Sequence, residues 1–285
     1  MVNSLRKVLI KHPKDAYINQ NKLNRESKKL NYLEIPNFEK ACSDFDNFLN
    51  ILETFGCEIH YLPLNEEASI DSIYTHDPCL ISNKGAIFSR MGKKDRSQEP
   101  KLMENHLNSI GIPTLGTIKY PGTLEGGDIV WIKERVIAVG EGYRSNAEGI
   151  NQLKNILGDL IDEIITVPLP HWTGKDDCLH LMSNLSPIDS NLFLVYSRLL
   201  PVSFRKFLLS EGIHLIEVPE SEYLSMGCNV LALAPKKVLM IEGNPITEER
   251  LIKNGVEVLK YDGLEISLKG SGGPTCLTRP FLREK

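Results

Sequence analysis

The sequence contains no pair of cysteines close enough along the chain to suggest a metal ribbon or a disulfide framework. Zinc ribbons and small disulfide scaffolds both depend on paired, closely spaced cysteines. The six cysteines of this chain lie far apart and form no CxxC motif: Cys42, Cys57, Cys79, Cys178, Cys228 and Cys276. A cysteine with a special role is therefore predicted to be catalytic rather than structural.

The sequence also lacks long hydrophobic runs and an excess of charge of one sign. The segment MVNSLRKVLIKHPKD has an apolar run of only three residues before Lys11, too short for the core of a signal peptide. The formal net charge is -4, with 41% hydrophobic and 25% charged residues, which is typical of a globular protein. We therefore expect a cytoplasmic protein that binds neither membranes nor nucleic acid.

Glycine-rich phosphate loops are absent as well. No turn from a strand into a helix carries a GxGxxG or Walker pattern. No cofactor is indicated, and an open α/β sheet, the main alternative architecture, would lack its usual ligand site.

The chain does contain a repeated unit, in which a helical segment ends at a glycine and runs into an apolar strand. In the first unit, residues 37–56, apolar side chains recur at three- and four-residue spacing before Gly56. The other helical segments are 101–111, 147–158, 203–212 and 246–255, ending at Gly111, Gly158, Gly212 and Gly255. The pattern predicts five helix-glycine-strand units.

Pairs of apolar strands with polar turns lie between these units and predict hairpins at 78–92, 128–142, 179–200 and 228–245. A fifth hairpin is divided between the two ends of the chain, residues 4–13 and 275–281. Five such ββαβ repeats that close on themselves follow the logic of a propeller. The predicted fold class is therefore α/β, a five-bladed pseudo-symmetric propeller formed by residues 1–285 as one domain.

A polar residue or a cysteine occurs at or near the start of each predicted hairpin, at the same position in each repeat. They are Asp77, Asp128, His180, Cys228 and Cys276, separated by 51, 52, 48 and 48 residues. Equivalent positions of a five-fold ring face one axis, so these side chains are predicted to converge. Taken singly, the aspartates fit turns and the others fit structural positions. Cys228 has an apolar strand context, and we interpret it as a core residue.

A cysteine, a histidine and carboxylates suit nucleophilic attack on a planar electrophile. Asp77, Glu125 and Asp128 would repel one another unless a cation pairs with them, and a guanidinium forms two-pronged hydrogen bonds to carboxylates. A metal would serve the same purpose, but the spacing of these residues matches no common set of metal ligands. The pattern therefore favours a guanidino substrate and no metal. His171, outside the phase, is interpreted as a loop residue.

These residues resemble the guanidino-modifying enzymes of the pentein fold, namely arginine deiminases, dimethylarginine dimethylaminohydrolases and amidinotransferases. The resemblance extends from Asp71 to Cys276. Its most specific motif is LEGGD, and YTHD, HLMSN and GGPTCLT follow the order of the family's other motifs. It is closest to dimethylarginine dimethylaminohydrolase and arginine deiminase.

The resemblance implies a role for each matching residue. Cys276 would attack the guanidinium carbon, and His180, supported by Glu125, would move protons. Asp77 and Asp128 would hold the guanidinium nitrogens. Arg96 and Arg144 would bind the substrate α-carboxylate, Asp71 its α-amino group, and Tyr74 would pack on it; for both arginines the alternative is a solvated surface charge.

Departures from the family pattern bear on the substrate. Met182 stands where arginine deiminases and amidinotransferases have an Asp, which favours a dimethylargininase-like hydrolase that releases citrulline and an amine. His76 and Thr275 replace the family's common Glu and His, so the size and charge of the substrate stay open. Arginine deiminase, arginine dihydrolase and amidinotransferase activities remain alternatives, although dihydrolases carry Asn at the place of Asp77.

A non-enzymatic alternative comes from the same fold, which also serves a ribosome-binding factor. Such a protein does not need the set of Cys276, His180 and carboxylates. The expected partner is a small guanidino compound, and a homodimer stays open. The polar segment 15–36 is a candidate lid over the site.

Overall fold

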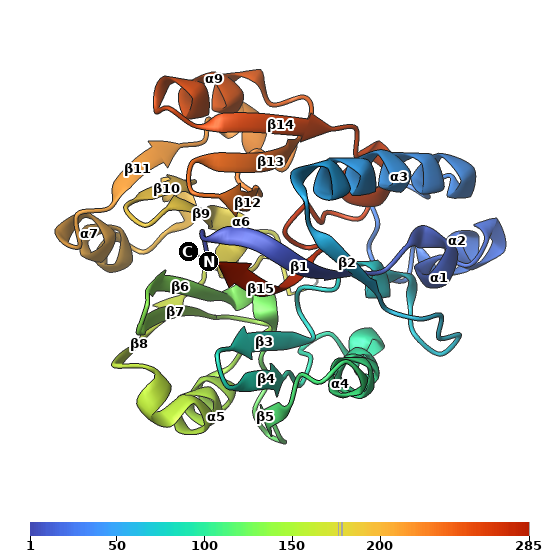
Figure 1. Cartoon of the computed structure of the whole chain (residues 1–285), viewed down its shortest axis with the longest axis horizontal. Coiled ribbons are helices and arrows are strands. Elements are labelled where there is room, and N and C mark those ends of the chain that lie inside the picture. The colour runs from blue at the N-terminus through green and yellow to red at the C-terminus, as the bar shows by residue number, and fades with distance from the viewer. Residues whose placement is uncertain (176, 178, 285) are drawn as a thin grey trace.

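The structure is a computed structural model that describes residues 1–175, 177 and 179–284. These residues form five three-stranded sheets arranged around a centre (Figure 1). In each sheet two strands pair antiparallel, and a third strand pairs parallel with the middle strand. The predicted α/β fold class with ββαβ repeats is confirmed.

The strands of each sheet follow the predicted units. The first sheet contains β15 (Arg279–Glu284), β1 (Ser4–Ile10) and β2 (Glu58–Tyr61). The second contains β3 (Cys79–Ser82), β4 (Gly85–Phe88) and β5 (Thr114–Thr117), and the third β6 (Ile129–Lys133), β7 (Val136–Glu141) and β8 (Glu163–Pro168). The fourth contains β9 (Leu185–Asp189), β10 (Leu192–Val195) and β11 (His214–Glu217), and the fifth β12 (Leu231–Ala234), β13 (Lys237–Ile241) and β14 (Glu257–Tyr261).

One helix precedes the outer strand of each sheet and lies toward the outside of the ring (Figure 1). These helices are α3 (Phe38–Phe55), α4 (Glu99–Ser109), α5 (Ala147–Leu157), α7 (Val202–Ser210) and α9 (Pro245–Lys253). In α3 the side chain of Asn37 caps the first turn, and Phe45, Phe48 and Leu52 are buried. Gly56 ends this helix with a φ of 93°, a left-handed conformation that glycine adopts without strain.

The ring closes at the two ends of the chain. β1 pairs antiparallel with β15, so Ser4 faces Glu284 and Leu9 faces Arg279, and it pairs parallel with β2 on its other side. Both termini therefore lie near the middle of the view in Figure 1. This arrangement confirms the divided hairpin.

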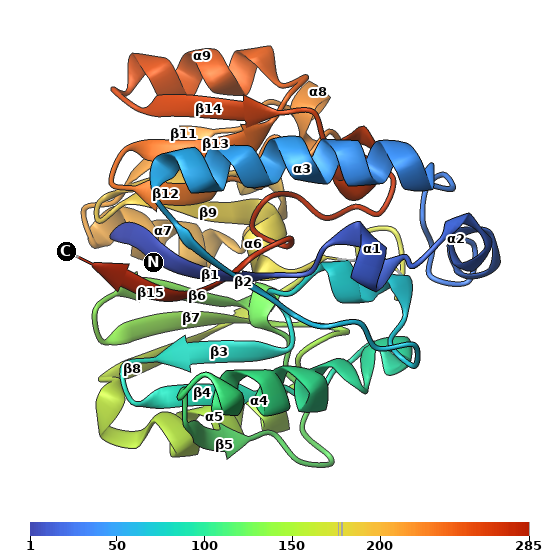
Figure 2. The same cartoon turned by 45° about the vertical axis from the view of Figure 1, so that its right-hand side comes forward.

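The segment 15–36 packs on the outside of the ring rather than extending away from it. It begins in α1 (Pro13–Ala16) and contains α2 (Gln20–Glu26), and Figure 2 shows α1 beside one end of α3 and α2 beyond that end. Tyr17, Leu23 and Leu30 are buried in the same hydrophobic cluster as α3. The segment is thus anchored through apolar side chains. Its role as a lid stays a prediction.

Two further short helices complete the description. α8 (Glu220–Tyr223) precedes the fifth sheet, and α6 (Leu181–Asn184) precedes β9. The sequence analysis predicted a strand from residue 179, so this part of the prediction is wrong: a helical turn separates His180 from the strand that begins at Leu185. Among the described residues, no helix is both long and apolar enough to cross a bilayer.

Candidate active site

The residues at the heads of the hairpins lie just before a strand, as the repeat predicts. Asp77 precedes β3 by two residues, and Asp128 ends a short helical turn that leads directly into β6. His180 is the N-cap residue of α6, and Cys276 lies three residues before β15. The fold brings Asp77, Glu125 and His180 together, with one ligand-type atom from each within 4.8 Å of the others.

His180 and Glu125 form the central pair of the site. Nε2 of His180 lies 2.9 Å from Oε2 of Glu125, and both residues are buried. Oε1 of Glu125 accepts hydrogen bonds from the backbone N–H groups of Gly92 at 2.9 Å and Lys93 at 3.0 Å. Because an ionised carboxylate only accepts hydrogen bonds, Nε2 is the ring nitrogen that carries the hydrogen.

The electrostatic surroundings keep Glu125 and Asp77 ionised. Burial alone would raise the pKa of Glu125, but the hydrogen bond from His180 and the charge of Arg144 lower it to about 2. Burial likewise opposes ionisation of Asp77, and the charges of His180 and Arg96 overcome it and hold the pKa of Asp77 well below its usual range. Nδ1 of His180 lies 3.9 Å from Oδ1 of Asp77. The imidazole thus stands between two carboxylates.

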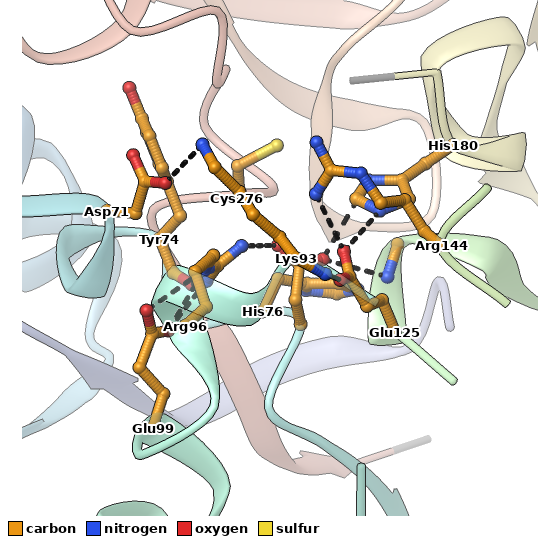
Figure 3. A network of polar contacts seen from close by, with 12 residues as sticks. Asp71, Tyr74, His76, Lys93, Arg96, Glu99, Glu125, Arg144, His180 and Cys276 are labelled. Carbon is orange, nitrogen blue, oxygen red and sulfur yellow. Dashed lines mark hydrogen bonds and ion pairs between the residues drawn. The ribbon is translucent and has the colours of Figure 1, made fainter. Parts of the chain in front are cut away.

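Arg96 is buried, 3% exposed, and does not extend into solvent. It donates to Oδ2 of Asp77 at 2.5 Å, to the carbonyl oxygen of Tyr74 at 2.7 Å, and to both oxygens of Glu99 (Figure 3). A guanidinium has five N–H groups, and four of those of Arg96 are engaged with these partners. Arg96 therefore positions Asp77 and has one N–H left for any other acceptor.

Asp128 is fully buried and accepts hydrogen bonds on both oxygens. Ser145 donates its hydroxyl at 2.6 Å, and the backbone N–H of Leu181 donates at 3.1 Å. Burial raises the pKa of Asp128 to about 6, although His180 and the hydroxyl of Ser145 act in the opposite direction. Asp128 thus connects the GGD turn to the first residue of α6.

Cys276 is partly exposed and lies beside Asn229. The Nδ2 group of Asn229 donates to Sγ at 3.3 Å, while its Oδ1 accepts from the backbone N–H of Thr275 at 3.1 Å. A Cβ atom at Gly273 would lie 2.5 Å from Oδ1 of Asn229, so a glycine is required there. In Figure 3 the sulfur lies on the side of the network that holds His180.

Gly127, in the turn of the LEGGD motif, has a similar steric role. A Cβ atom at Gly127 would lie 2.5 Å from Nδ1 of His180 and 2.9 Å from Oδ1 of Asp77. The backbone N–H of Gly127 donates to that same oxygen at 3.0 Å. The LEGGD motif therefore needs glycine at this position so that the imidazole and the carboxylate can approach the turn.

Asp71, Tyr74 and Arg144 lie at the edges of the site. Nζ of Lys93 donates to Oδ2 of Asp71 at 2.6 Å, and Arg144 donates to Oε2 of Glu125 at 3.2 Å. Arg144 is 6% exposed, so neither predicted arginine is a solvated surface charge. Tyr74 is buried, and its hydroxyl donates to the carbonyl oxygen of Ile266 at 3.2 Å.

His76, next to Asp77, is a neutral group. Burial, with the charge of Arg279, lowers the pKa of His76 to about 3. Nδ1 lies 2.9 Å from the carbonyl oxygen of Thr278 and must therefore carry the hydrogen. Nε2 is buried and has no hydrogen-bond partner among the residues described. His76 thus offers a neutral acceptor beside Asp77.

The geometry of the site also bears on metal binding. Within the described parts of the chain, Asp77, Glu125 and His180 form the one group of three close ligand-type residues. Two of them face arginine guanidinium groups, Arg96 at Asp77 and Arg144 at Glu125. Because the charge of each carboxylate is already balanced by an arginine, the arrangement suits proton transfer better than metal binding.

The remaining predictions from the sequence are located as follows. Cys228 is 1% exposed, and burial raises the pKa of its thiol far above the usual range, as for a core residue. His171 is exposed and contacts the hydroxyl of Tyr143 at 2.5 Å. Cys178 lies outside the described residues.

Sequence reasoning missed four residues that contact the site: Lys93, Glu99, Ser145 and Asn229. The signal for Asn229 was available, since it follows Cys228 at the head of the hairpin predicted at 228–245. The other three are polar residues in loops or at the start of a helix, with no pattern of their own.

Comparison with known proteins agrees with this geometry. The sequence profile described as N,N dimethylarginine dimethylhydrolase, eukaryotic, matches residues 12–283. The chain belongs to the dimethylarginine dimethylaminohydrolase family. It is 28% identical over 252 residues to the dimethylarginine dimethylaminohydrolase of Pseudomonas aeruginosa, covering 88% of this chain and 92% of the relative.

More distant relatives of this dimethylarginine dimethylaminohydrolase family member include arginine deiminases. The arginine deiminase of Listeria welshimeri is 23% identical over 253 residues, which cover 74% of this chain and 61% of that enzyme. Among solved structures, a Cys-to-Ser mutant of the Pseudomonas aeruginosa family member, complexed with citrulline, superimposes with a TM-score of 0.78. It is 25% identical, and the match covers 98% of this chain and 100% of that one.

Proposed function

We propose that this protein hydrolyses the guanidinium group of arginine or of an N-methylated arginine and gives citrulline plus an amine. The observation that carries this proposal is the pair of His180 and Glu125 beside Asp77, with the sulfur of Cys276 on the side of the network that holds His180 (Figure 3). Because Nε2 of His180 is hydrogen-bonded to Glu125 at 2.9 Å, Nδ1 is the proposed atom for proton transfer. Membership of the dimethylarginine dimethylaminohydrolase family supports the same chemistry.

The first half of the proposed reaction forms a covalent intermediate. The Cys276 thiol gives its proton to Nδ1 of His180. The resulting thiolate attacks the guanidinium carbon, and a C–S bond forms as the carbon becomes tetrahedral. The C–N bond to the leaving amine then breaks, and His180 donates a proton from Nδ1 to that nitrogen. The amine departs, and a thiouronium remains on Cys276.

The second half returns the enzyme to its starting state. His180 now takes a proton from a water molecule, whose oxygen bonds to the thiouronium carbon. The second tetrahedral intermediate collapses as its C–S bond breaks to restore the thiolate, and its hydroxyl proton passes to solvent water. Return of the Nδ1 proton to the sulfur restores the starting state. Glu125 stays ionised throughout and stabilises the imidazolium that forms twice in the cycle.

Asp77 and Asp128 are the proposed acceptors for the guanidinium nitrogens. Each oxygen of Asp77 accepts one hydrogen bond within the protein, and a carboxylate oxygen can accept two. Nε2 of His76 supplies a neutral acceptor beside Asp77. Met182 is 5% exposed and offers no charge. This site has less negative charge than one with additional carboxylates at positions 76 and 182, which suits an alkylated guanidinium.

Recognition of the substrate carboxylate falls mainly to Arg144 in this proposal. Arg96 has four of its five N–H groups engaged with Asp77, Glu99 and Tyr74, so it has no pair of N–H groups for two-pronged binding. Its contribution is to hold Asp77 ionised. Tyr74 packs beside the glycines that precede Cys276 and forms a wall of the site.

Arginine deiminase activity is the second candidate, because arginine deiminases match 74% of this chain. The two activities share the Cys276 chemistry and differ only in the leaving group, ammonia or an alkylamine. Both give citrulline.

Labelling with 2-chloroacetamidine, whose amidinium resembles a guanidinium, tests the proposed site. Burial raises the pKa of Cys57 and Cys79 to about 11, so these thiols are weak nucleophiles near neutral pH. We expect one adduct, on Cys276, and a labelling rate that falls about tenfold or more in Asp77→Asn.

Iodoacetamide, a neutral alkylating agent of similar size, is the matched control and should not depend on Asp77. Equal labelling of all the cysteines by 2-chloroacetamidine would contradict the proposal. It would favour the non-enzymatic alternative.

A further inference from the structure

Lys93 places the chain's own ammonium group on a carboxylate of the site. Its Nζ lies 2.6 Å from Oδ2 of Asp71 and 3.0 Å from the carbonyl oxygen of Leu30 (Figure 3). The side chain of Asp71 is 5% exposed and that of Lys93 is 19% exposed. An ion pair so largely removed from water interacts more strongly than one on the surface.

The backbone of Lys93 is held by the central pair of the site. Its N–H donates to Oε1 of Glu125 at 3.0 Å, next to the bond from Gly92. A Cβ atom at Gly92 would lie 2.5 Å from the carbonyl oxygen of Arg144, so the loop is packed tightly there. The position of the Lys93 side chain is therefore set by the same carboxylate that orients His180.

Lys93 also contacts the segment 15–36, because Leu30 belongs to it. One side chain thus joins the outer segment, Asp71 and, through its backbone, Glu125. A substrate ammonium that approaches Asp71 would meet the Lys93 ammonium already there. Two ammonium groups around one carboxylate repel each other, so the Lys93 ammonium weakens the binding of a second one.

The other cations of the network do not relieve this competition. Arg96 donates to Asp77 and Glu99, and Arg144 donates to Glu125. If Lys93 left Asp71, its ammonium would keep the carbonyl oxygen of Leu30 and would otherwise need water as a partner. A positively charged substrate group should therefore bind less tightly beside Asp71 than an uncharged one.

We propose that Lys93 is a specificity-determining residue that competes with a substrate α-ammonium for Asp71. The site then favours guanidino carboxylic acids whose α-nitrogen is absent or uncharged, such as α-deaminated or Nα-acylated arginines. This inference rests on the proposed function for the identity of the site, and it changes the role of Asp71 from an ammonium receptor to the partner of Lys93.

Binding to a variant that cannot turn over tests the inference. In a Cys276→Ser background, calorimetry gives the Kd of arginine and of 5-guanidinopentanoate, which differ only in the α-amino group. We expect 5-guanidinopentanoate to bind about tenfold more tightly or better. The Lys93→Met substitution should abolish or reverse that preference, because Asp71 then lacks an internal cation.

Two further variants make the experiment specific. Lys93→Arg keeps a cation beside Asp71 and should keep the preference, which also shows that the loop tolerates substitution. Lys94→Met removes the neighbouring lysine, which is exposed, and should leave the ratio of the two Kd values unchanged.

A ratio that Lys93→Met does not alter would overturn the inference, as would tighter binding of arginine to the protein that retains Lys93. Failure of the proposed function can be distinguished from failure of this inference. If the chain with Cys276 intact hydrolyses neither compound nor its dimethylated form, while the Kd ratio shifts as expected, then only the hydrolase proposal is wrong.

Discussion

The buried carboxylates near His180 and Arg96 differ in pKa because each has different partners. Glu125 and Asp77 each contact a cation and have lowered pKa values. Asp128 contacts a hydroxyl and a backbone N–H, so burial dominates and raises its pKa to about 6. Burial similarly raises the pKa of Glu99 to about 7, although Arg96 opposes this. The site thus combines two firmly ionised carboxylates with two that are costly to ionise.

Asp128→Asn is expected to stabilise the protein at pH 7.5 while it impairs catalysis. A folded pKa above the unfolded value gives stability that is present below the unfolded pKa and lost as the pH rises through about 6. The neutral Asn avoids that loss, so we expect about 1 to 2 kcal/mol more stability at pH 7.5 and a smaller difference at pH 5. Urea unfolding at both values measures it.

Activity and an exposed control complete this prediction. The kcat/KM of Asp128→Asn should fall about a hundredfold, because a guanidinium loses one carboxylate partner. Asp162→Asn, at an exposed residue paired with Arg135, should change neither stability nor activity appreciably. The stability that Asp128→Asn gains over the wild type should be larger at pH 7.5 than at pH 5. A gain that is smaller at pH 7.5 would contradict the account.

For single residues, the sequence predicts site residues that occupy the same position in successive repeats. It does not predict contacts between residues from different loops. His180, Asp77 and Asp128 are found from spacing alone. Lys93 is paired with Asp71, 22 residues away, and nothing in its local sequence distinguishes it from the adjacent lysine. The engagement of Arg96 with Glu99 and Asp77 likewise depends on how two loops pack.

At the scale of elements, the two glycine-containing turns hold the site together. The glycines before Cys276 leave room for neighbouring side chains: Gly272 faces the ring of Tyr74, and Gly273 faces Asn229. These glycines make room for protein side chains that contact or flank the nucleophile.

Gly127→Ala is expected to disrupt the site while leaving most of the fold intact. The added Cβ would lie 2.5 Å from Nδ1 of His180, so the imidazole or the turn must move. We expect kcat/KM to fall about a hundredfold or more, with a loss of about 1 to 3 kcal/mol in stability. Steady-state kinetics and thermal unfolding provide the two measurements.

Gly142→Ala is the matched control for that substitution. It lies after β7, where a Cβ would meet only Leu169 at 3.4 Å, an ordinary contact. Its effects on kcat/KM and stability should be small. Equal losses in the two variants would show that the GGD turn has no special steric role.

The short helix α6 shows why one element escaped prediction. Its first N–H, that of Leu181, donates to Asp128, which lies 53 residues earlier. The helical turn thus depends on a distant carboxylate, and the apolar residues of HLMSN fit a strand equally well in the sequence. The five outer helices were predictable because their periodicity and terminal glycines are local signals.

At the scale of the whole molecule, pairing of β1 with β15 closes the ring. The closing strand also supplies Arg279, whose side chain donates to the carbonyl oxygen of His76, next to Asp77. The ring was predictable because five repeats with equal phase leave one incomplete hairpin at each end. The packing of segment 15–36 against α3 was not predictable, since its polar composition gives few cues.

Removal of β15 should destabilise the whole chain rather than one sheet. A chain that ends at Thr278 leaves the edge of β1 unpaired, and we expect aggregation or a fall in Tm of more than about 10 °C. The full chain should unfold in one cooperative transition, as predicted for residues 1–285 acting as one domain.

A chain that ends at Glu284 keeps every described strand residue and serves as the control. Its Tm should equal that of the full chain. If the chain that ends at Thr278 folds with an unchanged Tm, closure by β15 is not what holds the ring together.

The central claim is hydrolysis of a guanidinium through Cys276, and a product assay in H₂¹⁸O tests it most directly. The protein is incubated with asymmetrically dimethylated arginine, with arginine and with their α-deaminated counterparts, and mass spectrometry measures ureido product, ornithine, dimethylamine and ammonia. We predict a ureido product with one ¹⁸O, an equimolar amine, and no turnover in Cys276→Ser. Undiminished turnover in Cys276→Ser, or no product from any of the four compounds, would contradict the account.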